Sequence, residues 1–439
     1  MTGTACAATS AAEAPDTIMP WMSTPDTPPS TARRWLLGLV LAGTALSPLH
    51  TKLAGAAWLA ACALALPFGF TAAARPSGVA TAARAWLCAC LVAVSLWLGL
   101  SWFWNEPCCT LTADQNAGLR LLLAAFATWV VARHASPPPP WQRWTGAAVA
   151  AACLLGAGLA LVEDRNFLPS HPIPWAVAMS FLVCLLLPRA LDPREERRAR
   201  WAWALGAACG IGAVLASQSR GAFGILAWAV VLAGLAVKRR RGHLRTPHLL
   251  AALLLLATLL GAAISLPSDP LRARKAWHEV SYAIDTADYN SSLGARVYLF
   301  RTAWQGIQES PWIGLGPTEL LRRIRHAGEQ LPPDQRARLE HVRQLGHAHN
   351  QYLNDTMEGG LLGLGALLAL IAGMAVAAVR LGRINPVAGQ QMAGLLVMHA
   401  TAGLSNVNLM HTYYVVMLSL CIVLVFLHAG EAPATRHSP

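Results

Sequence analysis

The sequence predicts an all-α polytopic membrane protein with about twelve transmembrane helices and one large loop outside the membrane that contains short helices. Two observations predict this fold class. Of the 439 residues, 55% are hydrophobic and only 13% are charged, and the mean hydropathy of +0.42 exceeds that of soluble domains. Apolar runs that approach the ~20 residues needed for one membrane crossing also recur along the whole chain.

The elements follow in order from the N-terminus. Residues 1–32 are rich in Ala, Thr, Ser and Pro and have no apolar core, which is typical of a disordered cytoplasmic tail and not of a cleaved signal peptide. Helices 1–9 are expected within residues 33–266, helices 10–12 within 356–430, and a second cytoplasmic tail at 431–439. The apolar runs that predict the helices are 35–49, 53–70, 86–104, 117–133, 145–162, 173–188, 201–217, 221–237, 248–266, 357–379, 387–407 and 412–429.

Basic residues predict the orientation. Clusters of Arg and Lys fall in every second loop, while the loops between them carry few cations, such as Lys52 and Arg165. The positive-inside rule then places both termini and the basic loops in the cytoplasm. Most of the net charge of +12 comes from these basic loops, whose residues determine the topology. The loops are therefore expected to contact anionic membrane lipids and not nucleic acid. The clusters are Arg33/Arg34, Arg75/Arg84, Arg133/Arg143, Arg189 to Arg200, Lys238 to Arg245 and Arg380/Arg383.

The ten cysteines have no metal-binding spacing. Most of them lie inside apolar runs, where cysteine behaves as a small hydrophobic residue. Cys108 and Cys109 fall in an outward-facing loop, and a structural or incidental role is the simplest interpretation for them.

Residues 267–355 form the one large loop, on the side opposite the basic loops. Acidic and basic residues are mixed in it, as in a folded layer that faces water. Ser291 or Ser292 is expected to cap a helix that Pro311 ends, and further helical stretches are expected at about 318–328 and 333–345. The first helix carries an apolar stripe made of Leu293, Val297, Phe300, Trp304 and Ile307.

Three motifs in this order carry a resemblance to a known family. The first is Ser-Arg-Gly-Ala at 219–222, and the second is Gly-Ala-Arg at 294–296 with Trp304 and Pro-Trp-Ile-Gly-Leu-Gly at 311–316. The third is His-Ala-His-Asn at 347–350 followed by Glu-Gly-Gly-Leu-Leu-Gly at 358–363. Together they resemble the bacterial O-antigen ligase superfamily, which also includes O-antigen polymerases and protein O-oligosaccharyltransferases. The resemblance covers roughly residues 200–380.

The resemblance implies a glycosyltransferase in the bacterial inner membrane whose active site faces the periplasm, with 267–355 as a large periplasmic loop. The expected donor is O-antigen linked to undecaprenyl diphosphate, and the expected acceptor is lipid A–core. Such a site must hold the negative charges of a diphosphate, and arginine suits this because its charge is permanent and its donor fork matches phosphate oxygens. Arg220, at the start of the eighth helix, is therefore predicted to bind the diphosphate and to be essential for catalysis.

Arg296 is the second predicted arginine. Helical periodicity barely separates it from Arg301, because the two residues flank the apolar stripe at comparable angles. The family pattern of Gly-x-Arg followed by Trp selects Arg296 for donor binding and catalysis.

For the two histidines, the question is which one acts. His347 and His349 are two residues apart, so their rings are expected to point in different directions. His349 is predicted to be the general base, because a position at a helix N-terminus keeps an imidazole neutral. His347, Asn350 and Tyr352 are predicted to contact the substrate.

No cofactor is expected, and no metal site is predicted. The first outer loop, at 47–52, has no carboxylate, and Asp285 and Asp288 give only faint support for an acidic metal site. A single displacement at the anomeric carbon also predicts inversion of configuration.

Two alternatives stay open. A polymerase or a protein O-oligosaccharyltransferase of the same superfamily would differ only in the acceptor. A transporter for a lipid-linked glycan belongs to another class, and it is expected to carry ionisable residues near the bilayer midplane. The membrane helices of this chain have almost no charge in mid-span, which favours surface chemistry.

Overall fold

The computed structural model describes residues 31–69, 78–104, 111–134, 139–164, 167–241 and 273–429. In these ranges every regular element is a helix, which confirms the predicted all-α class. Outside the described residues lie the predicted helix at 248–266, both tails except for Thr31 and Ala32, and the Cys108–Cys109 pair.

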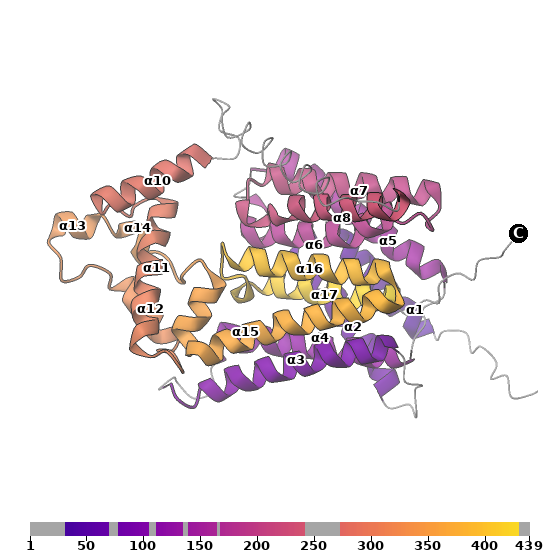
Figure 1. Cartoon of the computed structure of the whole chain (residues 1–439), viewed down its shortest axis with the longest axis horizontal. Helices are drawn as coiled ribbons and strands as arrows, with labels where there is room; N and C mark the ends of the chain where they lie inside the picture. Colours follow the sequence, from indigo (N-terminus) through magenta and orange to yellow (C-terminus); the bar gives the residue numbers. More distant parts are fainter. Residues whose placement is uncertain are drawn as a thin grey trace, which may run out of the picture.

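The larger part of the structure is a bundle of helices that run side by side (Figure 1). A helix lies at each predicted apolar run within the described residues. The bundle helices are α1 (Thr31–Leu46), α2 (Thr51–Gly69), α3 (Gly78–Leu100), α4 (Ala113–His134), α5 (Pro139–Val162), α6 (Pro172–Leu191), α7 (Arg197–Ala216), α8 (Gly224–Arg241), α15 (Gln351–Ile384), α16 (Pro386–Gly403) and α17 (Thr412–Ala429).

The bundle has the properties of a multi-pass membrane protein. Among the described residues, seven helices are long and apolar enough to cross a membrane, and two shorter apolar helices accompany them. Large apolar side chains point outward from the bundle, for example Leu59 on α2, Leu91 on α3 and Leu205 on α7. Such an apolar surface is stable in contact with lipid tails, whereas its exposure to water is unfavourable. The total of twelve crossings stays a prediction.

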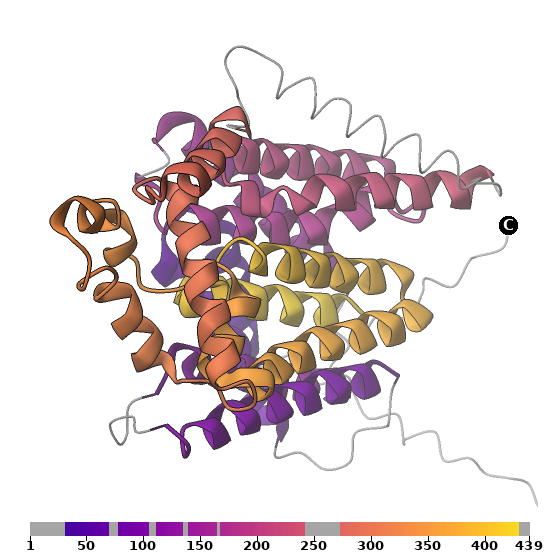
Figure 2. The same cartoon turned by 60° about the vertical axis from the view of Figure 1, so that its left-hand side comes forward.

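Short helices cover one end of the bundle (Figures 1 and 2). They form a layer that we call the cap, residues 273–350, and α11 crosses the ends of the bundle helices (Figure 2). The cap has a hydrophobic core of its own, which includes Leu299, Leu320, Ile324 and Val342. The cap helices are α10 (Ala273–Thr286), α11 (Ser292–Glu309), α12 (Pro317–Arg325), α13 (Pro333–Ala337) and α14 (Glu340–Arg343).

Helix α11 begins after the predicted N-cap residue, but its buried face differs from the predicted apolar stripe. The Ser291 hydroxyl accepts a hydrogen bond from the Gly294 amide at 3.0 Å, as an N-cap residue does. The predicted stripe is only partly buried: Trp304 is 57% exposed and its other members are half-buried, with Val297 and Ile307 packed against the core of the cap. The fully buried face consists mainly of small residues, namely Gly294, Ala295, Leu299, Thr302, Ala303 and Gly306. Small residues let the helix approach its neighbours closely, and Gly306 packs directly against Met357.

The glycine-rich parts of the second and third motifs join the cap to the bundle. Helix α15 kinks at Gly360, whose φ of 60° and ψ of −155° are not helical. The chain at 311–316 inserts into this kink: the Leu315 amide donates to the Met357 carbonyl at 2.9 Å, and the Leu361 amide donates to the Pro311 carbonyl at 2.8 Å. Gly314 also has a positive φ, of 67°, and lies against the Glu358 backbone. We call this contact the glycine clamp, and its role is structural.

The predicted helix at 387–407 is too long at its C-terminal end. Helix α16 ends at Gly403, and a loop at 404–411 that contains the 3₁₀ turn η3 (Asn408–Met410) leads into α17. The apolar composition of this stretch hid the helix end, because periodicity alone gives no stop signal there. The loop matters because it reaches the site described next.

Candidate active site

A cavity of ≈ 300 Å³ lies between the bundle and the cap. It brings together Arg220, Arg296 and His349, the residues that the sequence predicted to be catalytic, although they are far apart in the chain. The remaining lining residues are His171, Ile173, Gln218, Ser219, Gly221, Lys275, Ala276, Glu279, Ser292, His341, Leu345 and Ser405.

The first motif places Arg220 at the cavity wall. Ser219 is buried and its hydroxyl donates to the Pro172 carbonyl at 3.1 Å, which ties the motif to the start of α6. Gly221 packs against Ser405, so a side chain at position 221 would collide with the loop after α16. Arg220 itself is exposed and belongs to the 3₁₀ turn η2 (Arg220–Ala222), which precedes α8.

Helix α11 places Arg296 in the same wall. Burial lowers the pKa of the Arg296 guanidinium, and the positive charge of Arg220 lowers it further, while Glu279 opposes this effect. The two guanidinium groups therefore repel each other in a poorly hydrated place. Arg301, which periodicity did not separate from Arg296, instead donates to the Tyr289 hydroxyl at 3.0 Å.

Helix α10 adds two charged residues that the sequence analysis missed. Lys275 and Glu279 lie one helical turn apart, and the Lys275 ammonium is 4.0 Å from the Glu279 carboxylate. Glu279 also accepts a hydrogen bond from the Leu293 amide at the start of α11, at 3.1 Å. The cavity wall thus has three cations, Arg220, Lys275 and Arg296, against one carboxylate, which gives a net charge of +2 with neutral histidines. The i, i+4 spacing of Lys275 and Glu279 was the available signal.

The expected divergence of the two histidine rings is wrong. The rings of His347 and His349 touch, with centroids 4.1 Å apart and planes tilted by 55°. His349 has a φ of 53°, which turns the backbone away from both the extended and the helical path. Its amide donates to Nδ1 of His347 at 3.1 Å, so the proton of a neutral His347 ring sits on Nε2.

His349 is neutral at pH 7, as predicted, but for a different reason. Burial lowers its pKa to about 2, with further contributions from His347 and Arg296, while a hydrogen bond with Asn406 acts in the opposite direction. Burial likewise lowers the pKa of His347 to about 4. His349 precedes the N-cap residue Asn350 and lies outside α15. Desolvation, and not the helix dipole, is therefore the main cause.

Two more histidines belong to this group. His171 and His411 stack with ring centroids 5.7 Å apart, and burial together with His171 lowers the pKa of His411 to about 4. His171 and His411 come immediately before α6 and α17, and His349 comes two residues before α15. Neither of them was given a role from the sequence, although each lies next to a helix start, which was the available signal. Within the described ranges, no three His, Cys, Asp or Glu residues are placed to hold a metal ion.

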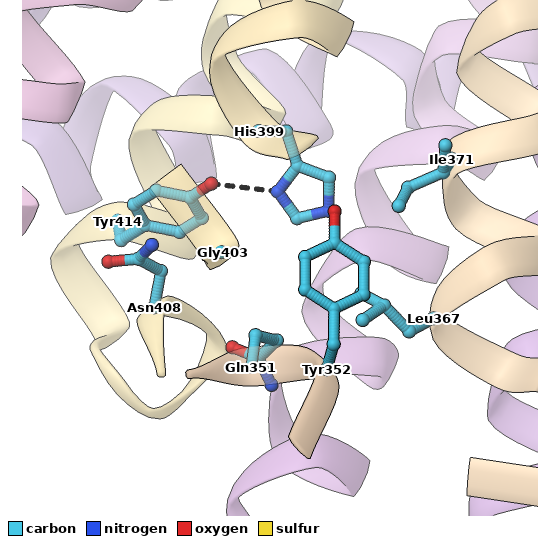
Figure 3. Close-up of a pocket in the computed structure, with 8 residues that line it drawn as sticks. All are labelled: Gln351, Tyr352, Leu367, Ile371, His399, Gly403, Asn408 and Tyr414. Atoms are coloured by element: carbon cyan, nitrogen blue, oxygen red, sulfur yellow. Dashed lines mark hydrogen bonds between the residues drawn. The ribbon is translucent and has the colours of Figure 1, made fainter. Parts of the chain in front are cut away.

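Asn350 and Tyr352 hold the start of α15 in place. The Asn350 side chain accepts from the Leu353 amide at 3.1 Å and donates to the Leu404 carbonyl at 3.3 Å. The Tyr352 hydroxyl donates to the Ala400 carbonyl at 2.9 Å. Figure 3 shows Tyr352 beside His399 in a small pocket inside the bundle. No residue that lines this pocket also lines the cavity. The substrate contacts predicted for Asn350 and Tyr352 stay predictions.

Comparison with known proteins agrees with the motifs. No curated protein matches this chain. Residues 205–368 match the family model described as O-antigen ligase. That stretch contains Arg220, Arg296 and His349 together with the glycine clamp. The match confirms the resemblance drawn from the three motifs: residues 205–368 are similar to the O-antigen ligase family.

Proposed function

We propose that this protein is an inner-membrane glycosyltransferase that moves O-antigen polysaccharide from undecaprenyl diphosphate to a sugar hydroxyl of lipid A–core. The reaction takes place at the periplasmic face. The observation that carries the proposal is the cavity that unites Arg220, Arg296 and His349 in a wall with a net charge of +2.

The charge of the wall fits the donor. A diphosphate that joins a lipid to a sugar carries two negative charges at neutral pH, and it gains charge as the glycosidic bond breaks. Arg220 and Arg296 repel each other in the free protein, as the lowered pKa of Arg296 indicates. A bound anion removes this repulsion and accepts paired hydrogen bonds from each guanidinium.

His349 acts as the general base. Its neutral imidazole takes the proton from the acceptor hydroxyl while the hydroxyl oxygen attacks the anomeric carbon. The bond from that carbon to the diphosphate breaks, and its electron pair leaves with the diphosphate. One such displacement inverts the configuration. The imidazolium that forms lies beside the donor anion, whose charge stabilises it and raises the basicity of the ring when donor is bound.

The transfer is proposed to need no metal, because the arginines neutralise the leaving group. A wall with three cations and one carboxylate also repels a divalent cation. Activity is expected to survive exhaustive chelation. Loss of activity with EDTA and recovery with magnesium or manganese would reverse this part of the proposal.

The decisive experiment offers the purified protein a lipid-linked repeat-unit donor with three alternative acceptors: lipid A–core, the donor itself and a pilin-like protein. The ligase proposal expects transfer to lipid A–core. Elongation of the donor alone would indicate a polymerase, and transfer to protein alone would indicate a protein O-oligosaccharyltransferase. Movement of the donor across vesicles without any transfer would indicate a transporter.

The periplasmic position of the cavity has its own test. Reporters fused near Arg240, at the end of α8, and near Arg325, in the cap, are expected on opposite sides of the membrane, the first in the cytoplasm. The basic residues at 238–245 motivate this expectation. Finding both reporters on one side would contradict the topology.

A further inference from the structure

We infer that Glu279 on α10 is a positioning residue: its carboxylate holds the first turn of α11 and thereby places Arg296 in the cavity wall. The inference rests on the proposed function, in which Arg296 binds the diphosphate. Glu279 is the one carboxylate among the residues that line the cavity, and its negative charge by itself opposes the binding of an anion. A structural role explains why a carboxylate stands in such a place.

The start of α11 has backbone N–H groups without partners inside the helix, as every helix start does. Ser291 covers one of them, because its hydroxyl accepts from the Gly294 amide at 3.0 Å. Glu279 covers another, since its Oε2 accepts from the Leu293 amide at 3.1 Å. Ser291 is local to the turn, whereas Glu279 belongs to a different helix. The hydrogen bond of Glu279 therefore fixes the start of α11 relative to α10.

The two helices are in direct contact around this hydrogen bond. Ala283 lies one turn after Glu279 on α10 and is fully buried. Gly294 faces it so closely that a methyl group added at position 294 would lie 3.1 Å from Cβ of Ala283. The first turn of α11 is thus held against α10 by packing and by one hydrogen bond from a charged acceptor.

Arg296 belongs to the turn that Glu279 holds. It follows Leu293 by less than one helical turn, and its side chain lines the cavity together with Lys275 and Glu279 of α10. A guanidinium makes paired hydrogen bonds to a phosphate only in a narrow geometry, which depends on a backbone that is held in place. Loss of the Glu279 contact is therefore expected to reach the donor through Arg296.

The second oxygen of Glu279 makes a weaker contact. Its Oε1 lies 4.0 Å from the Lys275 ammonium, which is longer than a hydrogen bond. The lysine side chain is 60% exposed and the glutamate side chain only 15%, so water screens the ion pair from the lysine side. The contact with the Leu293 amide is therefore the main anchor of the carboxylate.

Three variants separate the hydrogen bond from the charge. Glu279→Gln keeps an oxygen that accepts from the Leu293 amide but removes the charge. Glu279→Asp keeps the charge but shortens the side chain, and Glu279→Ala removes both. Asp285→Ala is the matched control, because Asp285 lies on the same helix, is exposed and does not line the cavity.

The first measurement is the binding of labelled undecaprenyl diphosphate to the full-length protein in detergent. Glu279→Ala and Glu279→Asp are expected to weaken binding by about threefold to tenfold, the equivalent of one hydrogen bond. Glu279→Gln is expected to bind at least as tightly as the wild type, and Asp285→Ala is expected to match it. A role of the charge alone predicts the opposite order, with tighter binding in Glu279→Ala and no change in Glu279→Asp. That order, or equal losses in Glu279→Gln and Glu279→Ala, would overturn the inference.

The second measurement is hydrogen exchange followed by mass spectrometry, which needs no substrate. The amides of residues 292–296 are expected to exchange about tenfold faster in Glu279→Ala and Glu279→Asp and at the wild-type rate in Glu279→Gln and Asp285→Ala. Unchanged exchange at α12 shows that the cap remains folded. Wild-type exchange at residues 292–296 in Glu279→Ala would overturn the inference. If the wild type does not bind undecaprenyl diphosphate, the proposed function fails, while the exchange rates still decide whether Glu279 holds the turn.

Discussion

Two groups of arginines in the described residues differ in their neighbours. On the cap surface, Arg323 lies 2.6 Å from Glu309 and 2.8 Å from Glu319, and Arg322 lies 2.7 Å from Glu319. Hydrogen bonds to these carboxylates raise the pKa of the Arg323 guanidinium and lower the pKa of Glu319 to about 2. In the cavity, burial and a neighbouring arginine lower the pKa of Arg296.

The difference separates arginines that are paired within the cap from arginines that are proposed to bind the donor. The surface arginines are neutralised within the protein. Among the residues that line the cavity, cations outnumber carboxylates, so a bound anion would reduce the repulsion between Arg220 and Arg296. Retaining such a repulsion lowers the stability of the free protein and is typical of a binding site.

The largest expected effect comes from the base. His349→Ala is expected to lower kcat by about 10²–10⁴-fold, because the proton acceptor is lost, and to spare donor binding. His347→Ala is expected to have a smaller but measurable effect, since the rings touch and Nδ1 of His347 holds the His349 amide. Turnover and donor affinity are measured side by side. Full activity in His349→Ala with an inactive His347→Ala would exchange the two roles.

The second effect tests the two arginine groups directly. Arg220→Ala and Arg296→Ala are each expected to abolish transfer and to weaken donor binding by about tenfold to a hundredfold, the equivalent of one charge-assisted contact. Arg323→Ala is the control, and its donor affinity is expected to match the wild type. Binding of a labelled undecaprenyl diphosphate measures all three variants. An equal loss of donor affinity in Arg323→Ala would contradict the distinction between the surface arginines and the cavity arginines.

The third effect concerns the glycine clamp. Gly360→Ala and Gly314→Ala force a side chain into a left-handed backbone and against the Trp312 or Glu358 backbone. Each is expected to lower the free energy of unfolding by about 1–3 kcal/mol. Gly365→Ala is the control, because a methyl group there meets nothing within 4 Å and the position is helical. Thermal unfolding in detergent measures the three variants, and equal melting temperatures would contradict the clamp.

The smallest effect is a pH dependence of stability. His347, His349 and His411 have folded-state pKa values of about 4, 2 and 4, below the ordinary value of 6.5. Below pH 6.5 the unfolded chain binds protons that the folded protein excludes, so stability is complete above pH 6.5 and falls as the pH drops toward 4. Melting temperatures from pH 7.5 to pH 4 measure this fall. His411→Asn is expected to make it shallower, and an unchanged slope would count against a buried neutral His411.

Much of the fold was predictable from the sequence, because membrane helices are specified by long apolar runs. Within the described residues, a helix lies at each predicted run. Errors arose where the backbone departs from regular structure. The end of α16 at Gly403 falls within an apolar stretch, and the sequence around the kink at Gly360 has the pattern of a continuous helix. Hydropathy alone therefore predicts neither the helix end nor the kink.

The site was predictable in part for a similar reason. The motifs predicted Arg220, Arg296 and His349, and the cavity unites them. The contact between His347 and His349 was not predictable, because it depends on a positive φ at a residue other than glycine. The effect of Glu279 on Arg296 depends on the contact between two helices, and the i, i+4 spacing of Glu279 from Lys275 does not reveal it.

The glycine clamp also determines which parts of the molecule belong together. Ala348, between the two histidines, and Met357, just before the kink, are both buried in the hydrophobic core of the cap. The histidine pair is therefore attached to the cap, together with Arg296, whereas Arg220 belongs to the bundle. A chimera that exchanges residues 292–359 between two such proteins would transplant the proposed base and one arginine as a unit. The recipient would keep its own Arg220, so the two arginines proposed to bind the donor would come from different parent proteins.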